Sequence, residues 1–391
     1  MADVDASTLD QATAATASRP LLRVVIAGGG IAGLEALLAL RALADQRVEL
    51  TLVAPDVEFA YRPVAAGVPF AVGRSRRIRL DRVARDANAG FVAGTVESVN
   101  TDEKLVRTSG SGALEYDALV LAVGAQPVSA IPRAMTWDDR SDSEMLGGLM
   151  QDFEHGYSRR LAVVVPPGPV WPLRAYELAL VITMAARSMS VDIETTIVTP
   201  QPSPLAVLAA PALEQLILTE LELAGVAVVC AAGVDVERGL PHTVVLHPSG
   251  RRLEVDRVLA LPALRGRAIP GIPVQAHGLI EVDAHCRVRG LEGVWAIGDG
   301  TAFPLKAGGF AAEQADVAAQ DVAATAGAVI QPRPFEPTGR GDLAGLPAGP
   351  FLESWLARGD DPAMGTHLSP AVLPMSMYLR HDLDAGRRGH V

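Results

Sequence analysis

Apolar and polar positions follow a regular order near the start of the chain. Leu22 to Ala27 is an apolar run short enough for one buried parallel strand, and helix formers continue without a breaker from Leu34 to Leu43. A second apolar run, Val48 to Val53, predicts another strand. Strand, helix and strand in this order indicate an α/β domain with a parallel sheet.

The same order returns in the middle of the chain. Leu161 to Val165 and Ile193 to Val198 predict buried strands on either side of a helix from Ala175 to Arg187. Pro211 to Ala224 predicts an amphipathic helix that begins at a proline. Three more strands are expected to close this second sheet: Val226 to Cys230, Thr243 to His247 and Arg257 to Leu261.

Two further apolar strands end in small residues, within Tyr116 to Ala125 and within Gly293 to Gly300. Small side chains at a strand end let a flat ligand pass close to the backbone. An alanine-rich helix, Phe310 to Ala326, follows the second of them. Gly90 to Val99 alternates as a strand, and Asp102 to Leu114 predicts a hairpin.

We therefore predict an α/β fold with two domains of this kind and a short C-terminal segment. The expected boundaries are a disordered tail at 1–20, a first domain at 21–140 and 270–330, a second domain at 141–269, and the C-terminal segment at 331–391. In that last segment, proline and glycine separate two short apolar pieces, 351–357 and 372–379, which either cover a cofactor or lie on a membrane.

The turn after the first strand is a G-x-G-x-x-G motif, Gly28 to Gly33, between a strand and a helix. In this context Gly28 makes the tight turn, Gly30 lets a pyrophosphate approach the backbone, and Gly33 lets the helix pack on the strand. The alternative, a glycine turn without a ligand, is disfavoured. The next strand ends in Ala54-Pro55, without the usual ribose-binding acid. This either argues against a standard NAD site in the first unit or requires another contact for the ribose.

The corresponding turn of the second unit, Pro166 to Arg174, is rich in proline. Prolines lack the N–H groups that a pyrophosphate needs, and Trp171 would fill the same space. The following strand ends in Thr199-Pro200, again without an acid. The second unit is thus predicted to keep the topology of a nucleotide-binding domain without the nucleotide.

Charge and composition narrow the classes of function. The 391 residues carry a net charge of -11, which argues against nucleic-acid binding, although 74–85 is a basic segment. That segment is interpreted as a solvated face rather than a docking patch for an acidic partner or an anionic membrane. Only two cysteines, Cys230 and Cys286, and no signal-peptide pattern favour a cytoplasmic protein. Peripheral contact with the inner face of the membrane and a homodimer stay open; no metal site is expected.

Three stretches together give the chain a family resemblance: the glycine turn at 28–33, YDALVLAVGA at 116–125 and VWAIGDGTAFPLKAGG at 294–309. Over about residues 21–335 the chain resembles the FAD-dependent pyridine nucleotide-disulfide oxidoreductases, with two Rossmann-like domains. Within them it is most similar to the branch of sulfide:quinone reductases, flavocytochrome c sulfide dehydrogenases and type II NADH dehydrogenases. The FAYRP loop, the AGGFAAEQAD stretch and the PVWPLRAYE turn favour the sulfide enzymes.

The resemblance implies that FAD binds in the first domain. Lys306 would then lie near the pyrimidine end of the flavin, where its charge stabilises the reduced anion, and Asp299 would bind the ribityl chain. On the residues alone, Asp299 could also be a turn carboxylate and Arg62 a solvated loop residue. The cofactor-binding residues expected are Gly28, Gly30, Ile31, Ala32, Gly33, Arg62, Val96, Ala122, Gly124, Gly298, Asp299, Lys306, Gly309 and Phe310.

The cysteines depart from the pattern of the sulfide enzymes. One of their redox cysteines stands six residues before a glutamate; if that glutamate is Glu177, Trp171 occupies the cysteine position. Their second redox cysteine lies late in the chain, whereas this sequence has none after Cys286. Cys230 is interpreted as a buried strand residue. We therefore do not expect persulfide chemistry of the family type.

These observations predict an FAD-dependent oxidoreductase with an unidentified donor and a quinone as a candidate acceptor. Lys306, Glu177 and Trp171 are the candidate catalytic residues, Glu177 as a proton carrier, and Tyr176 and Phe310 are candidates for the flavin face. Glu177 could instead be a solvated carboxylate, or a carboxylate near a helix N-terminus that the helix dipole favours. The alternatives are an NAD(P)H- or sulfide-dependent quinone reductase, and a non-catalytic binding protein that keeps the fold.

Overall fold

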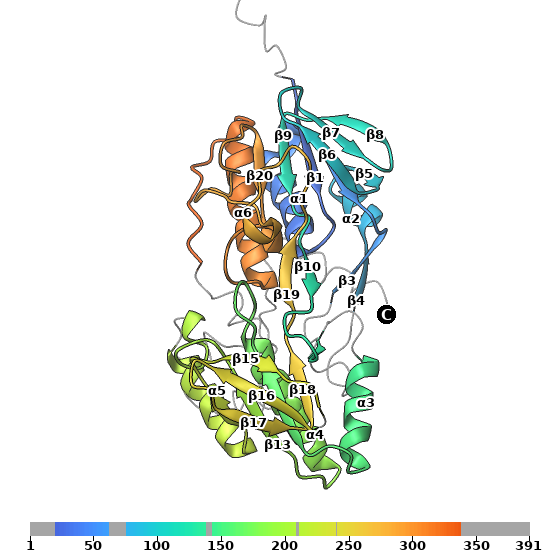
Figure 1. Cartoon of the computed structure of the whole chain (residues 1–391). Helices are drawn as coiled ribbons and strands as arrows, with labels where there is room; N and C mark the ends of the chain where they lie inside the picture. Colours follow the sequence, from blue (N-terminus) through green and yellow to red (C-terminus); the bar gives the residue numbers. More distant parts are fainter. Residues whose placement is uncertain (1–19, 62–75, 138–142, 209–210, 240, 338–391) are drawn as a thin grey trace, which may run out of the picture.

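The computed structural model describes residues 20–61, 76–137, 143–208, 211–239 and 241–337. The chain forms two lobes joined by a pair of strands (Figure 1). The first lobe contains the start of the chain and the segment that ends in α6, and the second contains the middle of the chain. Several expectations lie outside the described residues: those for the tail 1–19, for Arg62 and for the apolar pieces 351–357 and 372–379.

The first lobe is built on a parallel sheet of strand order β20-β9-β1-β2-β5. The alternation of strand and helix predicted this arrangement. Its strands are β1 (Leu22–Ala27), β2 (Val48–Ala54), β5 (Gly90–Ala93), β9 (Ala118–Leu121) and β20 (Val294–Ala296). The helices of this lobe are α1 (Ile31–Ala44), α2 (Leu80–Asp86) and α6 (Gly308–Thr325), and the 3-10 turns are η2 (Asp45–Arg47), η5 (Ala276–Gly278) and η6 (Gly298–Gly300).

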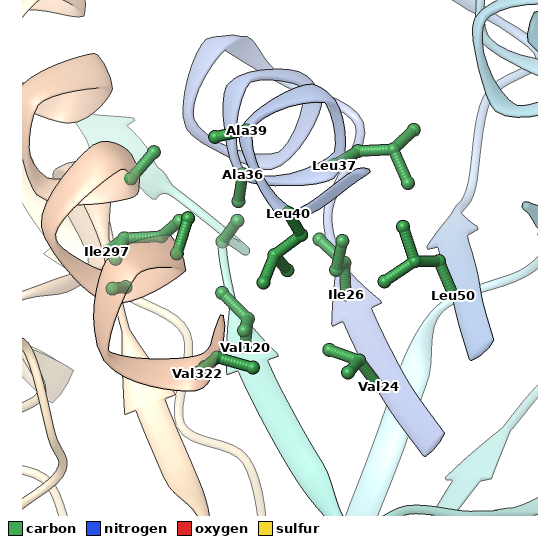
Figure 2. Close-up of a cluster of buried hydrophobic side chains, with 14 of the residues drawn as sticks. Val24, Ile26, Ala36, Leu37, Ala39, Leu40, Leu50, Val120, Ile297 and Val322 are labelled. Atoms are coloured by element: carbon green, nitrogen blue, oxygen red, sulfur yellow. The ribbon is translucent and has the colours of Figure 1, made fainter. Parts of the chain in front are cut away.

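The core of this lobe lies between the sheet and the helices α1 and α6. Figure 2 shows Leu40 of α1 over Ile26 of β1 and Val120 of β9, with Val322 of α6 beside them. All four side chains are fully buried. Alanine occupies the facing positions of both helices, so that the helix backbones approach closely. This packing fixes the N-termini of α1 and α6 at the same end of the sheet.

A buried carboxylate ties α6 to β20. Asp321 accepts hydrogen bonds from Arg287 at 2.6 and 2.5 Å and from the Trp295 indole N–H at 2.8 Å. Its side chain is only 3 % exposed. This contact sets the position of the strand that leads into Gly298.

We expect Asp321→Leu to lower the free energy of unfolding by about 2–4 kcal/mol, because it leaves the Trp295 N–H and the Arg287 guanidinium without their acceptor. Urea denaturation measures this change. Asp321→Asn keeps an acceptor for Trp295 and should lose less. Equal losses for the two variants would show that the hydrogen bonds contribute little.

We expected one strand from Gly90 to Val99, but the structure has two strands in this segment. β5 joins the parallel sheet, whereas β6 (Val96–Asn100) joins an antiparallel sheet with β7 (Leu105–Thr108) and β8 (Gly112–Glu115). The break falls where Gly94 meets Gly110: a Cβ on Gly110 would lie 1.9 Å from the Ala93 carbonyl oxygen. The expected hairpin is present as the β7–β8 pair.

The basic segment is ion-paired where the structure describes it. β3 (Glu58–Tyr61) pairs with β4 (Arg76–Arg79), and α2 follows directly. Arg77 contacts Glu58 at 3.1 Å and Arg79 contacts Asp81 at 2.9 Å, with both arginine side chains more than half exposed. This arrangement agrees with the interpretation of a solvated face.

The second lobe has its own parallel sheet, of order β11-β18-β12-β13-β14. Its strands are β11 (Met135–Thr136), β12 (Arg160–Val164), β13 (Glu194–Val198), β14 (Ala227–Val229) and β18 (Arg257–Ala260). Its helices are α3 (Ser143–Glu154), α4 (Leu173–Ser188) and α5 (Pro211–Ala224), with the 3-10 turn η4 (Ala206–Leu208). β11 enters this sheet before residue 141, where we expected the second domain to begin.

The expectation that Thr243 to His247 closes the second parallel sheet is wrong. This segment is part of β16 (His242–His247), the middle strand of an antiparallel sheet with β15 (Gly233–Val236) and β17 (Arg252–Val255). Short connections on both sides explain the difference, because neighbouring antiparallel strands need only a turn whereas parallel strands need a long crossover. The two lobes are joined by the antiparallel pair β10 (Ala125–Val128) and β19 (Ala263–Gly266) (Figure 1).

Among the helices that the structure describes, none is both long enough and apolar enough to cross a membrane.

Candidate functional site

The N-terminus of α1 lies at the end of β1 without a side-chain cap. Gly30 is the N-cap residue, and within the described residues no side chain caps the first N–H groups of the helix. These N–H groups lack intrahelical partners in any α-helix, and the helix dipole makes this end positive. A Cβ on Gly30 would meet no atom within 4 Å, so this glycine borders open space.

The other two glycines of the motif serve packing instead. Gly28 has a φ of +124°, and its Cβ would lie 2.1 Å from the Ala122 carbonyl oxygen. A Cβ on Gly33 would lie 1.8 Å from the Gly28 carbonyl oxygen. The tight turn therefore presses against the end of β9, and the motif leaves only Gly30 facing outward.

Glycine contacts bring the three motif stretches together. Gly28 meets Ala122 at the end of β9, and Gly300 approaches the Gly124 carbonyl oxygen, 3.2 Å from an added Cβ. Gly298, with a φ of +73°, packs against Ala32, whose Cβ would lie 3.1 Å from a Cβ at Gly298. A Cβ on Gly308 would lie 2.7 Å from the Ile31 side chain, so α6 starts beside α1. The stretches converge in space although they are far apart in sequence.

This cradle fits a dinucleotide such as FAD. An uncapped helix N-terminus is a ready-made site for a pyrophosphate. Gly30 and Gly124, the latter with a φ of +66°, both have open space where a Cβ would be. Gly309 is the second residue of α6 and is buried, and Val96 of β6 is half-buried against the first-lobe core. Their roles as cofactor contacts stay predictions.

Lys306 is a buried ammonium group between η6 and α6. The residue is 5 % exposed, and its Nζ donates a hydrogen bond to the Thr301 carbonyl oxygen at 2.6 Å. Burial lowers the pKa of Lys306 to about 8, while the charge of Asp299 acts in the opposite direction. The group therefore changes charge near neutral pH, which suits a residue that responds to charge on a neighbouring ligand.

Gln314 of α6 belongs to the same site and was missed in the sequence. Its Oε1 accepts a hydrogen bond from the Gly298 N–H at 2.7 Å. Thr301 Oγ1 donates to the Gly298 carbonyl oxygen at 2.9 Å, so both sides of this turn are fixed. The available signal was a long polar side chain at a buried position of an alanine-rich helix.

The turn before α4 is attached to the first lobe. The Val170 N–H donates to the Pro304 carbonyl oxygen at 3.2 Å, and Val170 forms a bridge with Leu305. The N–H groups of Arg174 and Ala175 donate to carbonyl groups of the same turn. Because the prolines have no N–H, few donors are left that could hold a pyrophosphate. This turn differs physically from the open turn before α1.

Aromatic rings join the two lobes at this contact. Trp171 lies edge-to-face with Phe310, with ring centroids 6.2 Å apart, and Phe310 with Phe303 at 5.4 Å. Phe335 contacts Phe303 at 5.1 Å. The row thus starts at the second-lobe turn and passes the N-terminal turn of α6, close in sequence to Lys306.

Tyr176 does not take part in this row, and its assignment to the flavin face is wrong. It is fully buried in the core of the second lobe, where α4 packs on the sheet. Burial raises the pKa of its hydroxyl. The helical period turns Tyr176 away from the side on which Trp171 meets Phe310.

Glu177 is a buried ion-pair partner, so the solvated alternative is wrong. The residue is 9 % exposed, and its Oε2 accepts a hydrogen bond from Arg174 Nη1 at 2.6 Å. Burial raises its pKa, and the charge of Arg174 opposes this shift. Arg174 and Glu177 are three residues apart in α4 and therefore lie on the same face of the helix.

The two cysteines lie away from the site and lack thiolate character. Cys286 is fully buried in the first-lobe core, and burial raises its pKa to about 12. Cys230, expected as a buried strand residue, instead follows β14 and is half-buried, and burial raises its pKa. In the part of the chain that the structure describes, no cluster of histidine, cysteine and acidic side chains could hold a metal ion.

Comparisons with known proteins agree with this architecture. The sulfide:quinone oxidoreductase of Aquifex aeolicus superposes with a TM-score of 0.67 at 19% identity, over 77% of this chain and 76% of that one. A ferredoxin reductase from Rhodopseudomonas palustris superposes with a TM-score of 0.58 at 20% identity, over 80% of this chain and 78% of that one. The NAD-dependent persulfide reductase of A. fulgidus superposes with a TM-score of 0.54 at 20% identity, over 80% of this chain and 60% of that one. At these low identities, the superpositions show a common fold and nothing more specific.

No curated protein sequence matches the chain. The family model described as pyridine nucleotide-disulphide oxidoreductase matches residues 22–322, which span both lobes. Members of this family typically bind FAD. The chain belongs to the pyridine nucleotide-disulphide oxidoreductase family and is an oxidoreductase.

Proposed function

We propose that this protein binds FAD in its first lobe and passes electrons through it from an organic or protein donor to a quinone-like acceptor. The observation that carries the proposal is the uncapped N-terminus of α1, which meets open space at Gly30 next to the converging ends of β9 and β20. Backbone N–H donors for a pyrophosphate and room for a flat ligand occur there together.

Each group of the cradle has a role in this proposal. The N–H groups of Ile31 and Ala32 would hold the pyrophosphate, Ala122 and Gly124 would line the cofactor, and Asp299 would accept a hydrogen bond from the ribityl chain. When bound, FAD supplies a centre that accepts and returns two electrons. The Lys306 ammonium would stabilise the negative charge that arises on reduction.

A nicotinamide donor fits the second lobe poorly. The Val170 N–H is already bonded to Pro304, and the turn contains four prolines, at 166, 167, 169 and 172. A sulfide donor of the family type fits poorly as well, because Cys230 and Cys286 lie away from the flavin site and burial raises both thiol pKa values. The apolar rings of Trp171, Phe303 and Phe310 support a flat apolar acceptor, as a quinone is.

The same contacts favour a second candidate, a binding protein that keeps the fold without turnover. In that case Trp171 and the prolines close an unused site. The two candidates differ in one measurable property, the ability of bound flavin to accept and return electrons.

We expect the purified protein, incubated with FAD, to show a flavin spectrum that anaerobic NADH, NADPH and sulfide leave unbleached for minutes. After chemical reduction, a water-soluble quinone should reoxidise the flavin. Rapid bleaching by NADH or NADPH would make the second turn a working nicotinamide site and contradict the proposal. Failure to retain FAD at all would favour the binding protein.

A further inference from the structure

The second sheet has a strand order that, in doubly wound folds, places ligands at the carboxyl ends of the strands. From β12 the chain passes through α4 to β13 on one side, whereas β18 lies on the other side of β12. Ligands of such sheets bind where neighbouring strands lead to opposite sides. Arg174 at the start of α4 and Trp137 at the end of β11 both lie at this edge, where the backbone N–H of Trp137 donates to the Ala260 carbonyl oxygen at 2.9 Å.

Arg174 leaves one edge of its guanidinium group unused. Its Nη1 donates to Glu177, and within the described chain Nε and Nη2 have no hydrogen-bond partner. Elsewhere that same edge holds an aspartate carboxylate in four arginines: Arg23 with Asp117, Arg79 with Asp81, Arg257 with Asp152, and Arg287 with Asp321. The Arg174 side chain is 20 % exposed, so it is not sealed inside the core of the second lobe.

Trp137 supplies an independent indication of a ligand. The residue is 6 % exposed, and its indole N–H, among the described residues, has no hydrogen-bond acceptor. An unpartnered buried donor costs about 1–3 kcal/mol, so native proteins seldom retain one without a reason. Arg174 lies over this ring, with Cζ 5.5 Å from the centroid. Two donor groups without an acceptor therefore adjoin each other.

The charge at this place also favours an anion. Arg174 is the second residue of α4, where the positive end of the helix dipole disfavours a cation. No acidic residue occurs in the first turn, and Glu177 is the acidic group that contacts Arg174 there. An incoming carboxylate would satisfy the guanidinium edge, the helix end and the indole N–H together.

We propose that Arg174 and the indole N–H of Trp137 bind the carboxylate group of a small organic acid. This inference rests on the proposed function and gives the electron donor a chemical class. A carboxylate matches the planar edge of arginine in two parallel hydrogen bonds. The body of the acid would face the rings of Trp171 and Phe310, which lead toward the first lobe. The site binds and orients the acid.

The test uses the four tryptophan indole N–H signals in ¹⁵N-correlated NMR spectra of the full chain incubated with FAD. Benzoate is the probe, benzamide its neutral counterpart and inorganic phosphate the competing anion. We expect benzoate to shift the Trp137 signal, assigned with Trp137→Phe. The Trp295 signal should stay in place, because Asp321 already accepts its N–H.

Variants of α4 make the test specific. Arg174→Gln should weaken benzoate binding at least tenfold. Arg187→Gln, at the other end of the helix, should leave it unchanged, because Arg187 hydrogen-bonds to the Ala224 carbonyl oxygen, away from the Trp137 ring. Glu177→Gln should tighten binding several-fold, since it removes a competing negative charge. Folding of each variant is checked by the dispersion of the same spectra.

Three results would overturn the carboxylate site: equal shifts by benzoate and benzamide, equal binding in the Arg174→Gln and Arg187→Gln variants, or a response to phosphate alone. The measurement reads binding and needs no electron transfer. Specific benzoate binding to a protein whose flavin cannot be reduced would keep the site and reject the proposed function. A reducible flavin without specific benzoate binding would keep the proposed function and reject the carboxylate site.

Discussion

Gly30→Glu is expected to weaken FAD binding at least a hundredfold while the protein stays folded. Gly30 has a φ of -82°, which any residue adopts, and a Cβ there meets no atom within 4 Å. The new carboxylate would occupy the open space before α1 and repel a pyrophosphate from the positive helix end. A hundredfold loss corresponds to about 2.7 kcal/mol, within the range for one like-charge contact in a partly buried site. Titration of the apoprotein with FAD, followed by flavin fluorescence, measures the change.

The matched control is Gly147→Glu on α3. Gly147 likewise has no atom within 4 Å of an added Cβ, and it is exposed on the second lobe. It should retain the affinity of the unmodified chain for FAD. Equal FAD affinity in both variants would show that the α1 turn does not hold the pyrophosphate. Unfolding of Gly30→Glu alone, seen by circular dichroism, would show that the space at Gly30 is needed for packing.

Much of the fold follows from the order of apolar runs. β1, α1 and β2 lie where the pattern of Leu22 to Val53 placed them, and α5 has the bounds predicted from its proline and its amphipathic period. These elements are fixed by local burial and helix signals, which a single sequence contains. β16 was placed in the wrong sheet because an apolar run does not specify its neighbour. The short connections on both sides of β16 were the available signal for antiparallel pairing with β15 and β17.

The candidate site was predictable in part, for the same reason. The glycine motif named the turn before α1, but only the structure separates Gly30, which faces open space, from Gly28 and Gly33, which serve packing. The roles of Glu177 and Gln314 depend on partners from other turns or strands. Arg174 lies three residues before Glu177, a spacing that permits an ion pair without requiring one. Side-chain contacts between distant segments cannot be read from periodicity.

Lys306→Met is expected to lower the midpoint potential of bound FAD and to stabilise the apoprotein. If Lys306 lies near the flavin, as we propose, loss of its buried positive charge removes stabilisation of the reduced form. A loss of about 1.4–2.8 kcal/mol corresponds to a shift of about -30 to -60 mV for a two-electron couple. Lys306→Arg, which keeps the charge, should change the potential much less. Anaerobic titration against reference dyes measures both variants.

The same substitution should lower the flavin potential but raise the stability of the apoprotein, and the gain in stability should depend on pH. The pKa of Lys306 is about 8 in the folded apoprotein, below the value of 10.5 expected when unfolded. Between these two pH values the unfolded chain binds more protons, so stability rises with pH; below pH 8 the full cost of the buried charge is present. Lys306→Met removes this cost and should raise the free energy of unfolding at pH 7 by about 1–3 kcal/mol. The loss of the hydrogen bond to the Thr301 carbonyl oxygen reduces this gain.

The two effects of Lys306→Met together decide whether this lysine serves the cofactor. Urea denaturation of the apoprotein at pH 7 and at pH 10.5 should show the gain at the lower pH and its loss at the higher one. A lower potential together with higher stability would mean that the buried charge of Lys306 destabilises the apoprotein but stabilises the reduced flavin. An unchanged potential, or a variant less stable at pH 7, would make Lys306 a structural residue that holds Thr301, and the assignment of its charge to the flavin would be wrong.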